Sequence, residues 1–166
     1  MASTSRALTT AAALLTGTVA LYMTLVAVGN ITDFGTNQAF VRHVLAMDTT
    51  FEDPDLMWRA VTDTRLQDAA YVLVIAWESV TALVLLLGAW LWLRRNGRTR
   101  ARRVSTYGLL MAMLLFGAGF IGIGGEWFAM WQSEQWNGLE AATRVFLMSG
   151  VVLIVVNLPH GEPAEG

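Results

Sequence analysis

The 166-residue chain contains no cysteine and no lysine, and it carries little charge of either sign. Without cysteine, disulfides, thiolate metal sites and cysteine nucleophiles are all excluded. All 11 basic residues are arginine, a bias that none of the functions considered below requires. Charged residues make up 14% of the chain and hydrophobic residues 55%, which is too apolar for a soluble domain of this size. The composition therefore predicts a membrane protein with the lipid bilayer as its solvent, and we expect no nucleic-acid partner.

Four apolar stretches approach or exceed the length that crosses a bilayer, about 20 residues at about 1.5 Å each. They comprise residues 8–29, 69–93, 107–127 and 139–158. The first stretch is too long for the core of a signal peptide, and no small-residue cleavage pattern follows it. The last stretch stops at Pro159, which cannot continue a helix. We therefore predict an all-α fold, a single membrane domain in which four transmembrane helices form a bundle.

A cluster of six arginines lies between the second and third stretches, in an expected loop over residues 94–106. Basic residues concentrate in cytoplasmic loops, so this loop and both termini are predicted to be cytoplasmic. Residues 30–68 and 128–138 then form an extracytoplasmic cap. Clusters of this kind also bind anionic lipid headgroups, although topology explains the cluster without a ligand. Its members are Arg94, Arg95, Arg98, Arg100, Arg102 and Arg103.

The segment between the first two spans carries both acidic residues and a helical hydrophobic pattern. Between residues 36 and 48 the apolar positions follow one stripe, which predicts an amphipathic helix at the membrane interface. Pro54 breaks the chain after that helix, and residues 56–68 are expected to form a second short helix. The two helices would cover the outer ends of the spans.

Tryptophan residues flank two of the expected spans. Such rings usually lie at the two membrane–water interfaces, where they form aromatic belts. We therefore expect interfacial positions for Trp90, Trp92, Trp127, Trp131 and Trp136.

Glu78 is a carboxylic acid inside the second span, nine residues and about 13.5 Å from its expected outer end. A charged carboxylate at that depth costs several kcal/mol unless it is paired, so Glu78 is either protonated or bonded to a neighbour. Ser149, at similar depth on the fourth span, and Arg144, nearer the outer surface, are the candidate partners. Together they form a candidate intramembrane polar site. The site is either a polar lock that joins helices or a proton or cation relay, and the lock is favoured because no second acid lies at this depth.

On the outer side, a metal site could be assembled only from Asp33, His43, Asp48 and Glu126. One histidine among scattered acids is a poor ligand set for zinc, so we expect no metal and no cofactor. Glu126 could instead form an ion pair with Arg144. No Ser-His-Asp spacing, phosphate-binding loop or H-E-x-x-H pattern appears, and no catalytic residue is predicted.

Glycine is concentrated in the third span. The run formally contains G-x-G-x-x-G, but that dinucleotide fingerprint acts only between a strand and a helix of a βαβ unit, and here it lies inside an apolar span. Small residues let another helix backbone approach closely, so the run predicts a helix-packing seam, either within the bundle or against a partner protein. The seam comprises Gly117, Gly119, Gly122, Gly124 and Gly125.

Several blocks of the chain resemble a family of bacterial predicted small integral membrane proteins. The blocks are GNITDF at 29–34, FVRHVLAMDTTF at 40–51, WRA at 58–60, GGEWFAMWQS at 124–133 and WNG at 136–138. With Glu78 and the spans, the resemblance covers nearly the whole chain. It implies a four-helix protein of the bacterial cytoplasmic membrane with a patterned outer surface, and it supplies no activity, substrate or catalytic residue.

Three functional hypotheses follow. The glycine seam, the tryptophan-rich outer surface and the lack of catalytic residues favour a non-catalytic accessory or assembly subunit of a larger bacterial membrane complex. Its expected partners are the lipid bilayer and either other membrane subunits or further copies of itself. The first alternative is a small transporter or channel in which Glu78 binds a proton or cation. The second is a membrane enzyme with an extracytoplasmic site at His43, Asp48 and Glu126.

Overall fold

The computed structural model describes residues 2–94 and 97–159, with side chains from Arg6 onward. The described residues form helices and no strand, which confirms the all-α class. Four of the helical segments are long and apolar enough to span a membrane. The elements are α1 (Ala2–Thr32), α2 (Phe34–Ala46), η1 (Met57–Arg59), α3 (Thr64–Trp92), α4 (Arg98–Met113), η2 (Leu114–Trp127), η3 (Met130–Gln132) and α5 (Leu139–Asn157).

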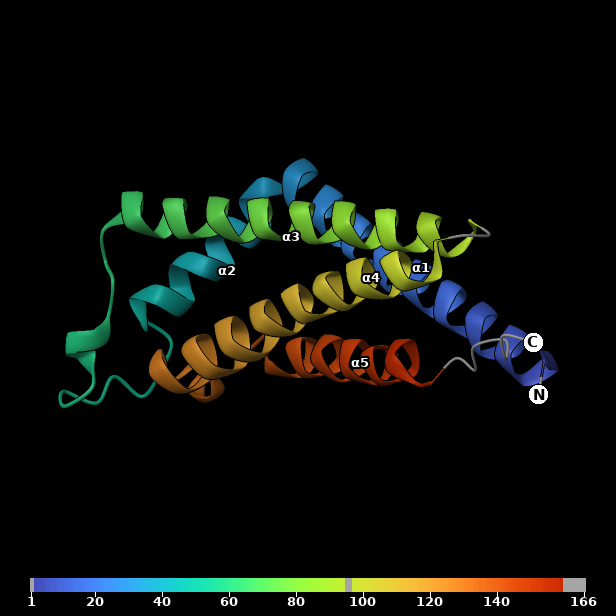
Figure 1. The fold of residues 1–166 in the computed structure, drawn as a ribbon. Helices are drawn as coiled ribbons and strands as arrows, with labels where there is room; N and C mark the ends of the chain where they lie inside the picture. Colours follow the sequence, from blue (N-terminus) through green and yellow to red (C-terminus); the bar gives the residue numbers. More distant parts are fainter. Residues whose placement is uncertain (1, 95–96, 160–166) are drawn as a thin grey trace.

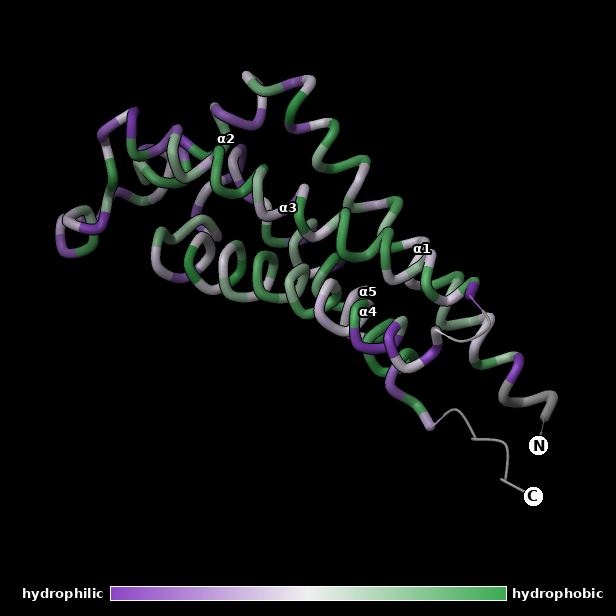
Figure 2. The backbone as a smooth tube through the Cα atoms, turned by 45° about the horizontal axis from the view of Figure 1, so that its top comes forward, coloured by the Kyte–Doolittle hydropathy of each residue, from purple (hydrophilic) through white to green (hydrophobic). Residues whose placement is uncertain are grey.

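The spanning helices form one bundle with two different ends (Figure 1). At one end α1 begins, α3 passes into α4, and α5 finishes; we call it the arginine end. The other end carries residues 47–63 and 128–138. These two segments are shorter than the predicted cap, and from here on the word cap refers to them alone. Figure 2 shows hydrophobic residues along the spanning helices and hydrophilic ones gathered mainly near these two ends. This distribution is the one a bilayer requires, because polar side chains are stable only near its two surfaces.

The helix predicted over residues 36–48 is present as α2, but it does not lie across the helix ends. It begins directly after α1, from which only Asp33 separates it, and it runs antiparallel to the first turns of α3 (Figure 1). The Phe34 ring lies 4.7 Å from that of Tyr71, and the Leu45 carbonyl accepts a hydrogen bond from Val61 N–H. The apolar stripe of α2 is therefore turned toward the bundle, and the part of the chain that projects as a cap begins only at Met47.

The second short helix predicted over residues 56–68 does not form as one separate helix. The single turn of η1 covers residues 57–59, and residues 64–68 already belong to α3, which begins at Thr64, five residues before the predicted span. The reason is Asp63, whose carboxylate accepts the backbone N–H groups of Arg65 and Leu66. This N-cap satisfies two of the amide groups that a helix start leaves unpaired, so the helix is continuous from Thr64 into the span.

The loop expected over residues 94–106 is also shorter in the structure. Helix α4 begins at Arg98, so Arg98, Arg100, Arg102 and Arg103 lie in its first turns. Arginine is a good helix former, and the charged cluster does not interrupt the helix that continues into the third span. Arg95 lies outside the described residues.

At the arginine end, small residues bring α3 and α4 together. A β-carbon on Gly88 would lie 2.7 Å from Ser105 Oγ, and one on Gly108 would lie 2.7 Å from two side-chain carbons of Leu85. Trp92 donates from Nε1 to Ser105 Oγ at 3.0 Å and is only 6% exposed. Trp92 therefore packs inside the bundle, contrary to its expected interfacial position, because its indole N–H has a polar partner on α4.

The third spanning helix changes its winding partway along. From Leu114 to Trp127 it is a π-helix, η2, and Phe128 N–H bonds the Ile123 carbonyl five residues back at 3.0 Å. Most π-helices are single turns, frequently at functional sites, so one of 14 residues is unusual. The segment contains all five glycines of the predicted seam, and residues without a β-carbon adopt unusual backbone geometry at little steric cost.

Candidate functional site

A polar pair lies at the centre of the bundle. Glu78 is the middle residue of α3 and is 2% exposed. Its Oε2 accepts a hydrogen bond from Asn30 Nδ2 at 2.6 Å. Asn30 belongs to the last turn of α1, which extends beyond the predicted end of the first span. We call Asn30 and Glu78 the central polar pair; it joins α1 to α3.

A tyrosine supports the central polar pair from the cap side. Tyr71 is 1% exposed, and its hydroxyl donates to the Asn30 backbone carbonyl at 3.2 Å. That carbonyl lies near the end of α1, where carbonyl groups lack partners within the helix. The hydroxyl therefore holds the end of α1 in the position from which the Asn30 amide reaches Glu78.

The candidate partners Ser149 and Arg144 are not brought to Glu78. Ser149 is fully buried, and its hydroxyl has no hydrogen-bond partner among the described residues. Arg144 has a 72% exposed side chain and lies 3.8 Å from Glu140, one turn earlier on α5. Arg144 lies within the first two turns of α5, where its charge reaches water and needs no intramembrane partner. The predicted three-residue polar site is thus replaced by Asn30, Glu78 and Tyr71.

The outer residues considered for a metal site are separated in the structure. His43 Nδ1 lies 3.0 Å from both carboxylate oxygens of Asp48, and its ring stacks on Trp136 at a centroid distance of 4.6 Å. Asp33 accepts the Thr36 hydroxyl, and Glu126 is exposed. In the described part of the chain, Glu126 forms no ion pair, and no three His, Cys, Asp or Glu residues lie close enough to hold a metal ion. The cluster is therefore one histidine–aspartate pair and two unconnected acids.

A second polar contact fastens α2 to α3 near the cap. Arg42 binds Asp68 through two parallel hydrogen bonds of 2.9 Å, and Gln38 donates to the same carboxylate at 2.9 Å. The bonded carboxylate raises the pKa of Arg42 above its ordinary value. A forked arginine–carboxylate pair fixes orientation as well as distance, so it sets how α2 lies along α3. The only sign of this contact in the sequence was that Arg42 and Asp68 both lie between the first two predicted spans. That does not specify that they pair.

The cap and the adjoining end of η2 present four exposed aromatic rings, which we call the aromatic face: Phe51, Trp58, Trp127 and Trp131. They form two edge-to-face pairs, Phe51 with Trp131 at 5.9 Å and Trp58 with Trp127 at 5.5 Å. The Arg59 guanidinium lies 4.8 Å from the centre of the Trp127 ring. The aromatic face therefore combines rings from both segments of the cap with Trp127, the last residue of η2.

Two hydrogen bonds join those two segments. Phe51 N–H donates to Gln132 Oε1 at 2.9 Å, and the hydroxyls of Thr49 and Ser133 are 2.9 Å apart. Because residues 47–63 and 128–138 are tied to each other here, the rings of the aromatic face are held in place before any partner binds.

The glycine seam serves two purposes. Two of its members, Gly117 and Gly125, admit side chains of α5: an added β-carbon on Gly117 would lie 2.7 Å from the Phe146 ring, and one on Gly125 would lie 2.7 Å from Leu139 Cδ2. Gly119 and Gly124 instead line a pocket, and Gly122 is exposed. The seam thus packs within the bundle on one side and borders an open space on the other.

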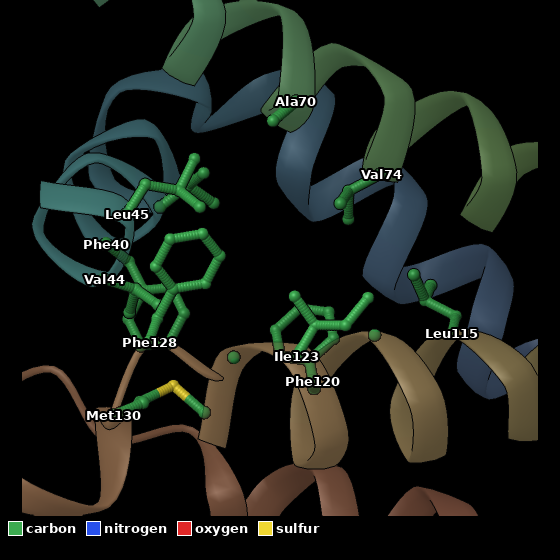
Figure 3. A pocket seen from close by; sticks show the side chains of 13 residues that line it. Phe40, Val44, Leu45, Ala70, Val74, Leu115, Phe120, Ile123, Phe128 and Met130 are labelled. Carbon is green, nitrogen blue, oxygen red and sulfur yellow. The ribbon is translucent and has the colours of Figure 1, made fainter. Parts of the chain in front are cut away.

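That open space is an apolar pocket of about 140 Å³ between α2, α3 and η2. In Figure 3 side chains from the three elements and from the loop after η2 surround it, and the only labelled side chain with an atom other than carbon is Met130, through its sulfur. Its wall comprises Phe40, Val41, Val44, Leu45, Ala70, Val74, Leu115, Gly119, Phe120, Ile123, Gly124, Phe128 and Met130.

The arginines at the opposite end have mixed surroundings. Arg94 lies over the Trp90 ring at 4.2 Å, and Arg102 bonds the Asn157 side chain and backbone at the end of α5. Trp90 is 48% exposed, as an interfacial ring would be. Arg98, Arg100 and Arg103 are exposed, so their guanidinium groups are accessible at the surface of this end.

Comparison with known proteins gives one family and no characterised relative. A model of the family described as "Predicted small integral membrane protein (DUF2165)" matches residues 8–159. No curated protein and no solved structure matches the chain. The match covers all four membrane-compatible helices almost completely, together with the central polar pair, the cap and the pocket. The chain therefore belongs to this family of predicted small integral membrane proteins.

Proposed function

We propose that the protein is a non-catalytic accessory or assembly subunit of a larger membrane complex, and that a partner subunit binds the aromatic face. The observation that carries the proposal is the exposure of that face: Phe51 is 72% and Trp58 70% exposed. Tryptophan and arginine are the residues most enriched where binding energy concentrates in protein interfaces, and here Arg59 lies against two tryptophan rings. Because the cap is held by its own hydrogen bonds, binding would order few side chains and lose little conformational entropy.

The central polar pair supports a structural role for the membrane part. The Glu78 carboxyl has a hydrogen-bond partner of its own chain, so it needs no ion or substrate to be stable in the bundle. The pair also lies where α1 ends and α2 begins, a position at which two helices need a fixed relative orientation. It therefore acts as a polar lock between α1 and α3.

We also propose that the protein lies in the bacterial cytoplasmic membrane with both termini and the arginine end in the cytoplasm. The arginine bias between α3 and α4 supports this orientation. The absence of cysteine allows a direct test, because single cysteines can be introduced without background. In intact cells an impermeant thiol reagent is expected to label Glu52→Cys in the cap and to leave Arg98→Cys unlabelled until the cells are opened. The reverse pattern would invert the orientation.

The experiment that tests the subunit proposal is purification of the tagged protein, at native expression and in mild detergent, followed by mass spectrometry and native-gel sizing. We expect a stoichiometric larger complex. Trp58→Ser with Trp131→Ser should release the partner, whereas Trp90→Ser, which removes an exposed tryptophan at the opposite end, should not. A protein that purifies alone, or a complex that survives loss of the aromatic face, would contradict the proposal.

A small proton- or cation-linked transporter or channel is the second candidate. The observation in its favour is a fully buried acid at the middle of a spanning helix, beside the break between α1 and α2. Glu78→Gln separates the two candidates, because glutamine retains the hydrogen bond to Asn30 but cannot carry a proton. Retained function supports the lock, and abolished function with intact assembly supports transport.

A membrane enzyme at the outer face is the third candidate, and its support is the contact of His43 with Asp48, a pair that orients and polarises an imidazole. His43→Ala tests it. Unchanged function of this variant would remove the enzyme hypothesis without affecting the other two.

A further inference from the structure

The apolar pocket lies in the half of the bundle nearer the cap. On α3 it is lined by Ala70 and Val74, six and ten residues after Thr64. At about 1.5 Å per residue, Val74 lies about 15 Å from the start of the helix. Half of the hydrocarbon core of a bilayer is also about 15 Å thick. The pocket thus begins beside α2, near the cap, and reaches toward the bilayer midplane.

The pocket is closed toward the arginine end and open to the side. Trp77 donates from Nε1 to the Met111 carbonyl at 3.0 Å, which ties α3 to α4 just beyond the deepest wall residues. On the open side, the wall residue Ile123 is 55% exposed. Ile123 belongs to a membrane-spanning segment, so what its exposed side chain meets outside the protein is lipid.

Its chemistry and size restrict what can occupy it. All wall residues are apolar, so a water molecule would find no side-chain hydrogen-bond partners there. A helix is about 10 Å across and does not fit a space of about 140 Å³. An apolar cavity of about 150 Å³ in a soluble protein stays dry and binds a small hydrocarbon. If the pocket were empty, the side chains of its wall would lack van der Waals contacts on that side, which is energetically unfavourable.

We propose that this pocket binds the end segment of one acyl chain of a membrane lipid from the leaflet at the cap end. The chain enters from the side beside Ile123, packs between α2 and η2, and ends near Val74 and Leu115. Because lipid tails are as apolar as the wall, the chain is held by close packing against fixed side chains rather than by the hydrophobic effect. The two glycines of η2 in the wall, Gly119 and Gly124, provide the room for it.

Photolabelling of the purified full-length protein tests the proposal. The protein is reconstituted in vesicles of phosphatidylethanolamine and phosphatidylglycerol that contain a trace of phosphatidylethanolamine with a diazirine midway along one acyl chain. After irradiation, labelled residues are mapped by mass spectrometry. We expect labelling of Phe120 and Ile123 in excess of Leu73, which is 67% exposed to lipid at the same depth on α3. No other protein is present, so the result does not depend on the subunit proposal.

Two glycine variants of η2 form a matched pair. A β-carbon on Gly119 would meet its nearest neighbour at 3.7 Å and one on Gly122 at 3.5 Å, so both positions admit a side chain. Gly119→Leu fills the pocket and should abolish the excess labelling; Gly122→Leu, on the exposed side, should leave it unchanged. If Gly119→Leu fails to fold, Val74→Phe fills the pocket from the opposite wall.

Three results would overturn the proposal. One is equal labelling of the pocket residues and Leu73, which would make the pocket ordinary lipid-facing surface. Another is the same loss in Gly119→Leu and Gly122→Leu. The last is a covalent dimer linked through pocket residues, which would show that a second copy of the chain occupies the space.

Discussion

The same two helices, α3 and α4 with its continuation η2, are packed tightly at one end and held apart at the other (Figure 1). At the arginine end Gly88 leaves 2.7 Å between a notional β-carbon and the Ser105 hydroxyl. Toward the cap, the helices separate around the apolar pocket, and a β-carbon on Gly119 would have its nearest neighbour at 3.7 Å. At Gly88 the absence of a side chain permits close contact between the two helices. At Gly119 the absence of a side chain leaves the space between them open.

The polar contacts of α3 change along the same direction. The Glu78 side chain, midway, is buried and bonded to one amide, whereas Asp68, near the cap, is about one-third exposed and bonded to an arginine and a glutamine. A buried polar group that loses its partner cannot recover a hydrogen bond from water, but an exposed one can. The cost of a substitution on this helix pair is therefore expected to fall from the arginine end toward the cap.

The largest effect is expected at Gly88. A β-carbon there would also lie 3.2 Å from the Ser105 backbone, so Gly88→Leu has to push α4 away and should cost more than about 3 kcal/mol. The apparent melting temperature in detergent and the monodispersity on size exclusion measure it. Gly119→Leu, the same change in the open region, is the control and should melt close to the native protein. Equal losses in the two variants would show that the difference between the ends is not one of packing.

The central polar pair comes next. Asn30→Leu leaves the buried Glu78 carboxyl without its amide donor, which is expected to lower stability by about 1–3 kcal/mol. The double variant Asn30→Leu with Glu78→Leu removes both polar groups and should recover most of that loss. Thermal unfolding of the three proteins in one detergent gives the comparison. A double variant that is less stable than the single one would mean that Glu78 has another essential partner.

Glu78→Gln should be milder still. Glutamine keeps the size of the side chain and an acceptor for Asn30, so a loss of about 1 kcal/mol or less is expected. Melting temperature reports the stability, and co-purification of the proposed partner subunit reports the function. A large loss of stability in Glu78→Gln would contradict the polar lock, because it would mean that stability depends on the carboxylic acid itself and not on the hydrogen bond to Asn30.

The helices were predictable because their signal is length and composition, which the membrane imposes on each span separately. Their ends were not, because they depend on local contacts such as the Asp63 cap of α3 and the continuation of α4 from Arg98. The π-winding of η2 has no periodic signature of its own, and only its glycine content was visible. Trp92 shows the limit of composition: a tryptophan at a span end was expected at the interface, but the Ser105 hydroxyl on the neighbouring helix binds it inside the bundle.

For the candidate site, the importance of Glu78 could be inferred, because an acid in an apolar span is costly wherever it points. The hydrogen-bond partner of Glu78 could not be inferred, because Asn30 was expected just beyond the end of the first span. In the structure α1 is longer and crosses α3, and this brings the Asn30 amide to Glu78. A lone asparagine between Gly29 and Ile31, with no helix breaker before Asp33, was the available signal. The pocket had no signal in the sequence, because an empty space arises from the relative angles of three elements.

The smallest effect is expected for Arg42→Gln, in the open region. The arginine makes two hydrogen bonds of 2.9 Å to Asp68, yet both side chains are more than a third exposed, so water replaces much of what is lost. Gln38 also continues to hold the same carboxylate. The melting temperature should barely change, whereas the position of α2, which forms one wall of the pocket, should become less fixed. Hydrogen exchange of α2 amides measures this, with Arg65→Gln as a control that removes an exposed arginine from the first turn of α3. Faster exchange in α2 for Arg42→Gln alone would show that this ion pair positions the pocket wall; equal exchange in both variants would leave that task to the apolar contacts of α2.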